Sequence, residues 1–254
     1  VRLANALGHV ELSLAEFEDA PQRPVLRMAR VAEAQHAPFA GLNRAMAAQI
    51  HVVVPPGVVV DEAIVIDHSV PSGGALVAPR LVIDVGRDAQ VTVIERFRST
   101  ADGPALVLPV VQVRADAAAR VQYLGVNELS VDAWSIGHQQ AVGDRDSTTL
   151  LATVALGGDY ARVRTEARLV GPGGSTRQVA LYFAGGEQMH DFRTIQDHAA
   201  PHTTSDLLFK GAVQDHSKSV YTGLIRIREN AKGTVAFQTN RNLTLSDGAW
   251  AESV

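Results

Sequence analysis

The 254-residue sequence contains no cysteine. Without thiolates, the chain has no ligands of the usual kind for an iron–sulfur cluster and none for a cysteine-type zinc site. The sequence therefore predicts that no cluster is bound by this chain alone. The absence of cysteine is compatible with a reducing, cytoplasmic location and does not require one.

Long apolar runs and runs of like charge are also missing. The longest apolar stretch, residues 52–60, is interrupted by Pro55-Pro56-Gly57 and falls short of the ~20 residues of a membrane helix. Lysine and arginine number 23 against 27 aspartates and glutamates, which gives a formal net charge of -4 without a basic stripe. We therefore expect neither a membrane nor a nucleic acid as a partner.

The two ends of the sequence indicate an excerpt of a longer protein. The chain begins with Val1 instead of methionine, and it stops at Val254 directly after a strand-like run. The missing signal peptide therefore carries no weight.

The first 49 residues are interpreted as an N-terminal cap segment. Strands are predicted in residues 10–14 and 24–31. Apolar residues then recur at three- to four-residue spacing, which predicts one short helix over residues 38–48. The residues with this spacing are Phe39, Leu42, Ala45 and Met46.

Residues 50–254 show a different pattern, in which short β-branched runs alternate with tight turns. Glycine, asparagine and aspartate in the turns supply the left-handed backbone that such turns need. No long helix interrupts the series, so alternating strands and helices are disfavoured. The predicted strands are residues 58–60, 64–66, 81–85, 91–94, 110–113, 121–124, 150–156, 161–169, 177–183, 191–196, 219–228, 233–239 and 243–245.

Loose internal repeats favour a β-solenoid as the all-β architecture of this region. Residues 86–93 resemble residues 115–123, and the run 221–225 is followed fourteen residues later by 235–239. The similarity is weaker than in a leucine-rich or WD repeat. A β-sandwich or jelly roll therefore remains the alternative.

The last sixty residues carry the most distinctive motifs. They read HAAPHTTS at residues 198–205, SVYTGLI at 219–225 and AKGTVAFQTNRNLTLS at 231–246. In order and spacing these motifs resemble the SufB/SufD family of iron–sulfur cluster assembly scaffold proteins. The QTNRNL string at residues 238–243 is more similar to the D subunit than to the B subunit.

The resemblance implies a fold, a function and partners. The fold would be a right-handed parallel β-helix, and the chain would be a non-catalytic scaffold subunit. It would pair with a SufB-type subunit and act with a SufC-type ATPase, and the cluster would form at the subunit junction. The family's D-subunit histidine and its ATPase-binding C-terminal helical region would lie beyond Val254. A SufB-type homodimeric scaffold remains an alternative.

We expect the partner interface to lie in residues 221–254, where the final coils would present an open sheet edge. This edge would also allow a homodimer of the chain. Asn240 and Asn242 are interpreted either as a solenoid corner or as a subunit contact. Trp134 and Trp250 are expected to pack, and Trp250 is also a candidate interface anchor. The predicted interface residues are Tyr221, Gln238, Asn240, Asn242 and Trp250.

Four histidines, His190, His198, His202 and His216, fall in one quarter of the chain. His198 and His202 have the H-x3-H spacing of half a zinc finger, which holds metal when it lies on a helix. Pro201 disfavours a helix here, so turn or surface histidines are the favoured interpretation. Metal binding by His198 and His202 is kept as the alternative.

The enzyme alternative is a β-helix polysaccharide lyase or hydrolase that uses Asp144 and Asp146 as a pair of acids. Aromatic residues, which line the grooves of such enzymes, make up only 5% of the chain. We therefore favour a solvated turn for this pair. The glycine-rich residues 171–176 lack the lysine of a phosphate-binding loop and are interpreted as a corner. The sequence contains no G-x-x-x-x-G-K-S/T loop, so we expect the chain to have no ATPase activity.

Overall fold

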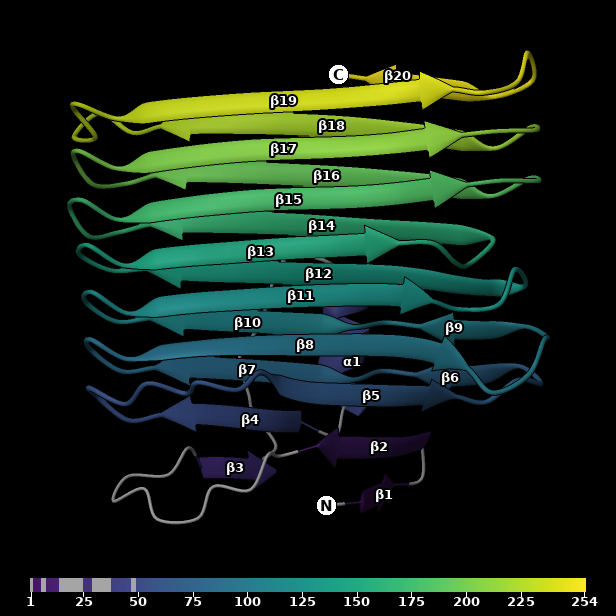
Figure 1. Ribbon diagram of the computed structural model, residues 1–254, viewed down its shortest axis with the longest axis horizontal. Coiled ribbons are helices and arrows are strands. Elements are labelled where there is room, and N and C mark those ends of the chain that lie inside the picture. Colours follow the sequence, from purple (N-terminus) through teal and green to yellow (C-terminus); the bar gives the residue numbers. More distant parts are fainter. Residues whose placement is uncertain (1, 6–7, 14–24, 29–37, 47–48) are drawn as a thin grey trace.

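The computed structural model describes residues 2–5, 8–13, 25–28, 38–46 and 49–254 (Figure 1). From Gln49 onward the chain winds through stacked coils whose strands form two large sheets. Nearly all strand pairs are parallel, and one short helix is present. The predicted all-β parallel β-helix is therefore confirmed.

The first sheet, sheet A, is built from every second long strand of the series. Its parallel members are β5 (Ile64–Val70), β8 (Gln90–Ser99), β11 (Arg120–Glu128), β13 (Thr148–Ala155), β15 (Ser175–Ala184), β17 (Thr204–Val213) and β19 (Val235–Thr244). At one edge, β2 (Gly8–Ser13) pairs antiparallel with β5, and β1 (Arg2–Asn5) pairs antiparallel with β2.

The second sheet, sheet B, contains the strands that alternate with these. Its parallel members are β4 (Gln49–Val54), β7 (Arg80–Val85), β10 (Val110–Ala115), β12 (Ala133–Gly143), β14 (Tyr160–Leu169), β16 (Met189–His198), β18 (Lys218–Ile227) and β20 (Trp250–Ser253). The short strands β6 (Ala75–Val77) and β9 (Ala105–Val107) extend this sheet beside β12, and β3 (Val25–Met28) pairs antiparallel with β4.

Each coil takes 27–31 residues, as the register of sheet A shows. The positions Tyr123, Leu151, Gln178, Leu207 and Gln238 pair in turn on neighbouring strands. The first predicted repeat reflects this period, because Val91 lies directly beside Val121. The second repeat does not, because residues 221–225 and 235–239 belong to opposite sheets.

One corner of the solenoid repeats a left-handed residue in every coil, with φ between 55° and 74°. In six of these coils its N–H donates to a carbonyl of the next coil, at 2.8–3.3 Å. We call this set the corner column: Gly57, Asp88, Ala118, Asp146, Gly173, His202 and Gly233. A non-glycine residue in the left-handed conformation raises the energy of the backbone by ~1–2 kcal/mol. The hydrogen bond between neighbouring coils offsets this backbone strain.

The interior changes in character along the solenoid. The early coils enclose aliphatic side chains such as Val52, Ile66 and Ile83, all with 0% exposure. Later coils enclose aromatic and polar groups, among them Phe192 and Gln178. Inward-facing side chains alternate with outward-facing ones on each strand, as the pleat requires.

The predicted helix is present as α1 (Pro38–Met46), but its orientation is unexpected. The apolar residues Phe39, Leu42 and Met46 are exposed. The polar residue Asn43 is buried instead, and its amide donates to the carbonyl oxygens of Pro79 at 2.8 Å and Leu108 at 2.6 Å. These carbonyls lie where sheet B is interrupted, so the helix is held by hydrogen bonds at that interruption.

Several predicted strands need correction. Residues 58–60 form only an isolated bridge, from Val59 to Gln90. The predicted strands 233–239 and 243–245 are parts of the single strand β19, which spans Val235–Thr244 and leaves out residues 233, 234 and 245. Strands β1, β4, β6, β9, β12, β17 and β20 were not predicted. Parts of the predicted elements at residues 14, 24, 29–31 and 47–48 lie outside the described residues. No helix among those described is long and apolar enough to cross a membrane.

Candidate functional site

The predicted interface asparagines lie in the middle of β19, so the interpretation of Asn240 and Asn242 as a corner is wrong. In register, Asn240 pairs with the buried Phe209, which places both asparagines in the row that faces the interior. Asn240 donates to the hydroxyl of Ser253 at 2.7 Å, and Asn242 accepts a hydrogen bond from Tyr182. Asn240 therefore connects sheet A to sheet B, whereas Asn242 connects two strands of sheet A, β19 and β15.

The other predicted interface residues differ in their exposure. Tyr221 is 2% exposed and its hydroxyl lies 2.8 Å from that of Thr194 in the interior. Gln238 belongs to the same inward-facing row as Asn240 and is exposed in this last described coil. Trp250 on β20 is 47% exposed. Of the five, Trp250 offers the largest apolar surface to a partner.

The four histidines are not alike. His198 and His190 are fully buried, so the surface or turn interpretation is wrong for them, whereas His202 and His216 are exposed in turns. Both ring nitrogens of His198 are within hydrogen-bond distance of hydroxyls, at 2.8 Å from Thr203 and 2.9 Å from Ser205. Among the described residues, no three histidine, aspartate or glutamate side chains gather as a metal site.

The remaining sequence candidates lie in corners. Asp144 and Asp146 belong to the turn between β12 and β13, where Asp146 is a member of the corner column and an Asp144 carboxylate oxygen accepts the N–H of Arg145 at 2.7 Å. The solvated-turn interpretation is therefore confirmed for this pair. Residues 171–174 form the next corner of the stack, with Gly173 in the left-handed conformation.

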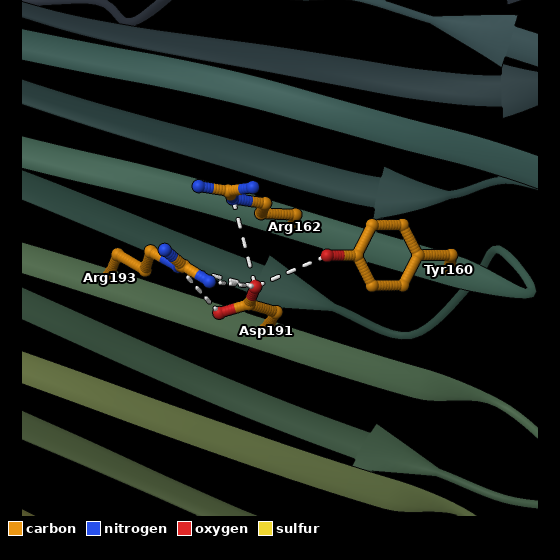
Figure 2. A network of polar contacts seen from close by, with 4 residues as sticks. All are labelled: Tyr160, Arg162, Asp191 and Arg193. Atoms are coloured by element: carbon orange, nitrogen blue, oxygen red, sulfur yellow. Dashed lines mark hydrogen bonds and ion pairs between the residues drawn. The ribbon is translucent and has the colours of Figure 1, made fainter. Parts of the chain in front are cut away.

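The most concentrated polar chemistry lies elsewhere, on the outer face of sheet B. Figure 2 shows its centre, where Asp191 of β16 receives Tyr160 and Arg162 from β14 and Arg193 from its own strand. The Tyr160 hydroxyl donates to Asp191 at 3.2 Å, and Arg193 approaches its two oxygens at 3.3 Å. Arg162 lies 3.7 Å away. Burial, and secondly the charge of Asp191, raise the pKa of Tyr160, which therefore stays protonated and donates.

Two further carboxylates on this face each have two basic partners. Asp197 accepts two hydrogen bonds from Arg228, at 2.8 and 2.7 Å, and lies 3.6 Å from Arg168. The hydrogen bonds from Arg228 are the main cause that lowers the pKa of Asp197.

Glu166, on the same outward row of β14, lies 3.3 Å from His138 and is also paired with Arg164. Its pKa is lowered chiefly by the hydrogen bond from His138. The pKa values of Asp197 and Glu166 are therefore lowered by their basic partners, and each of the three carboxylates lies beside at least one arginine.

We refer to this surface as the arginine face. Its arginines are Arg162, Arg164, Arg168, Arg193, Arg226 and Arg228, and its carboxylates are Glu166, Asp191 and Asp197. The sequence did contain a signal for it. Tyr160, Arg162, Arg164, Glu166 and Arg168 alternate with apolar or small residues, which predicts one polar outer face of a half-buried strand.

An apolar groove adjoins the arginine face at the end of β12. It has a volume of about 420 Å³ and is lined by Gly74, Ala75, Leu76, Pro104, Ala105, Leu106, Asp132 and Trp134. Trp134 is 49% exposed, which contradicts its prediction as a packed residue. Its indole N–H donates to Asp159 at 2.9 Å, and its ring lies 5.5 Å from that of Tyr160.

The described residues thus form a β-solenoid in which no group of three or more histidine, aspartate or glutamate side chains could hold a metal ion, and comparison with known proteins gives the family. The family described as "SUF system FeS cluster assembly, SufBD core domain" matches residues 68–254. These residues include every parallel coil after the first, and the chain therefore belongs to the SufBD family.

The curated relatives carry the same description. An iron–sulfur cluster assembly SufBD family protein of Mycobacterium leprae is 33% identical over 191 residues, which cover 72% of this chain and 48% of that protein. One from Mycobacterium tuberculosis is 36% identical over 151 residues, or 57% of this chain and 38% of the relative. The iron–sulfur cluster assembly protein SufD of Escherichia coli is 26% identical over 163 residues, or 64% and 38%. The chain thus spans about half the length, or less, of these relatives.

Proposed function

We propose that this chain is the β-helical core of a non-catalytic, SufD-type scaffold subunit that supports iron–sulfur cluster assembly in the cytoplasm. It pairs with a SufB-type subunit and acts with a SufC-type ATPase. The observation that carries the proposal is the family match over residues 68–254. Similarity to SufD of Escherichia coli supports the D-type assignment.

The chemistry of the chain is consistent with a supporting role. The sequence has no cysteine, so thiolate ligands for a cluster must come from another source. Its two fully buried histidines are occupied or enclosed: His198 contacts two hydroxyls, and His190 lies against the rings of Tyr182 and Phe192. In this proposal the iron–sulfur cluster is a product assembled on the whole complex, with ligands that other subunits supply.

The pairing surface in this proposal is the last pair of coils, as the sequence predicted. Strands β19 and β20 carry exposed apolar side chains, of which Phe237 is 62% and Trp250 47% exposed. Burial of one such aromatic side chain contributes ~2–3 kcal/mol to association. We expect these two side chains to contact the SufB-type subunit.

A binding experiment tests this pairing. The purified chain is mixed with a SufB-type subunit and a SufC-type ATPase, and the mass of the complex is measured by light scattering after size exclusion. Trp250→Ala together with Phe237→Ser should weaken complex formation at least tenfold. Trp134→Ala is the matched control, because its indole is equally exposed but lies on β12.

The result that would contradict the proposal is a complex that forms equally well with the double variant, or no complex with intact subunits. If the chain alone measures twice its own mass and the double variant does not, the same surface forms a homodimer. The polysaccharide-cleaving alternative gains no support from the structure, because Asp144 and Asp146 occupy a tight turn instead of a groove.

A further inference from the structure

The arginine face carries more positive charge than its carboxylates neutralise. On and beside β14, β16 and β18, six arginines face three carboxylates. At the edges of the face, Lys218 adds one positive charge, and Asp132, Asp159 and Glu252 add three negative charges. The chain as a whole has a formal net charge of -4, so this face opposes the sign of the rest of the molecule. Such a patch attracts negatively charged ligands and suppresses positively charged ones.

The guanidinium groups retain donors that the chain itself does not use. Each guanidinium has five N–H bonds, and a single carboxylate accepts about four hydrogen bonds in total. Asp191 is shared by Arg162 and Arg193, and a side chain such as Arg193 remains about half exposed, at 48%. The carboxylates therefore orient the arginines while donors remain directed to solvent.

The regular sheet fixes the positions of these groups. Arg164 and Arg193 are register partners on neighbouring strands, and Arg162 is the register partner of Asp191. Neighbouring strands lie ~4.8 Å apart, so the cations form a flat array instead of a flexible cluster. An array held in this way loses little side-chain entropy when it binds.

The adjoining groove supplies an apolar contact beside the charges. Trp134 forms one wall of the groove, and its hydrogen bond to Asp159 fixes the orientation of the indole. The indole ring packs against the ring of Tyr160, whose hydroxyl donates to Asp191. Tryptophan, tyrosine and arginine are the side chains most often found to dominate binding energy at protein interfaces. Here all three types meet at one exposed place.

We propose that the arginine face and the Trp134 groove together bind an acidic segment of a partner protein. Its carboxylates contact the arginines of β14 and β16, and one apolar side chain enters the groove. A nucleic acid fits less well, because the three carboxylates retained on the face and the negative net charge oppose a continuous phosphate backbone. This site borders the pairing surface, because β18 pairs with β20 and Lys218 is the register partner of Trp250, but it uses other side chains and goes beyond the proposed function.

The test uses the full chain and a fluorescein-labelled peptide of glutamates that flank a single tryptophan. Fluorescence anisotropy should show saturable binding that weakens as salt is raised. A second peptide with glycine in place of the tryptophan should bind at least about fivefold more weakly. A third peptide with lysines in place of the glutamates should not bind.

Variants locate the site. Trp134→Ala and the pair Arg164→Gln with Arg193→Gln should each weaken binding of the acidic peptide at least about fivefold. The matched control is Arg177→Gln, since Arg177 is also exposed and paired with one carboxylate, Asp206 at 3.3 Å, but lies on sheet A. Circular dichroism establishes that each variant is folded.

Three results would overturn the proposal: no saturable binding of the acidic peptide, an equal loss in the Arg177 variant, or tighter binding of a duplex DNA oligonucleotide than of the peptide. The variants also separate this proposal from the pairing of subunits. Loss of peptide binding in the Trp134 variant with intact subunit pairing supports both, because the two surfaces use different strands.

Discussion

The buried network of His68, Glu95 and Tyr123 allows one side-chain contribution to be measured cleanly. Glu95 is 1% exposed and accepts the Tyr123 hydroxyl at 2.7 Å, while its other oxygen lies 2.8 Å from His68. Burial, followed by the charge of Glu95, raises the pKa of Tyr123 well above its ordinary value, so Tyr123 is the donor. The three residues come from three neighbouring strands, and the network therefore ties three coils together.

Tyr123→Phe removes this hydroxyl and no other volume. A hydrogen bond to a charged group contributes ~1.5–3 kcal/mol, so the free energy of unfolding should fall by about that amount. For a chain of this length the melting temperature should fall by roughly 3–12 °C. Tyr160→Phe is the matched control, because its hydroxyl bonds Asp191 at 3.2 Å and the side chain is partly exposed. Tyr160→Phe should lower the free energy of unfolding by about 0.5–1 kcal/mol.

Chemical and thermal unfolding followed by circular dichroism measures both variants. Repeating Tyr123→Phe in a Glu95→Gln background completes a double-mutant cycle. Tyr123→Phe should lower the free energy of unfolding by less in the Glu95→Gln background, because a neutral amide is a weaker hydrogen-bond acceptor than a carboxylate. The reasoning fails if Tyr123→Phe costs no more than Tyr160→Phe, or if its cost is the same in both backgrounds.

Three further predictions concern the interior and the iron–sulfur cluster. Gly211→Ala should destabilise the chain by about 3 kcal/mol in urea unfolding, because the new Cβ would lie 1.9 Å from a Tyr182 ring carbon, and Tyr182→Leu should restore part of the loss. Burial lowers the pKa of His190 from 6.5 to about 4, so the unfolded state binds more protons between these values. Stability should therefore fall on the order of 3 kcal/mol as pH drops through this window, and His190→Gln should flatten that part of the pH profile. Anaerobic reconstitution of the chain alone should yield no stoichiometric cluster by iron and sulfide analysis, because cysteine is absent.

A β-solenoid could be favoured because its corners and its β-branched strands are local features of the sequence, and its parallel β-helical form was implied by the resemblance of residues 198–246 to the SufB/SufD family. Strand β12 escaped prediction because its centre, Gly137-His138-Gln139-Gln140, contains neither β-branched nor large apolar residues. Its strand conformation is imposed by the ladders to β10 and β14 on either side. Tertiary pairing overrides local propensity at such positions.

The candidate sites were harder to predict, because they depend on which row of a strand faces outward. Asn240 and Asn242 have turn-forming side chains, yet the register of β19 with β17 places them in the interior row. The arginine face combines residues about 30 positions apart, such as Arg162 and Asp191, and no local motif joins them. Alternation in β14 alone could indicate an outer polar row but not its partners.

The corner column also determines at which residue each strand of sheet A begins, and therefore which side chains of that strand face the interior. In sheet A, strands β8, β11, β13, β15, β17 and β19 all begin two residues after a member of the column, for example Gln90 after Asp88 and Val235 after Gly233. A single-residue insertion between a column member and its strand would exchange the inward and outward rows of that strand. An insertion at the opposite corner, or before the column member at the same corner, leaves this count unchanged. The chain itself shows the second case, because Gly233 follows Ile227 by six residues whereas His202 follows the register partner His198 by four. Variation in coil length among related sequences should therefore avoid the step from each column member to its strand, while a coil can be lengthened elsewhere without loss of its core.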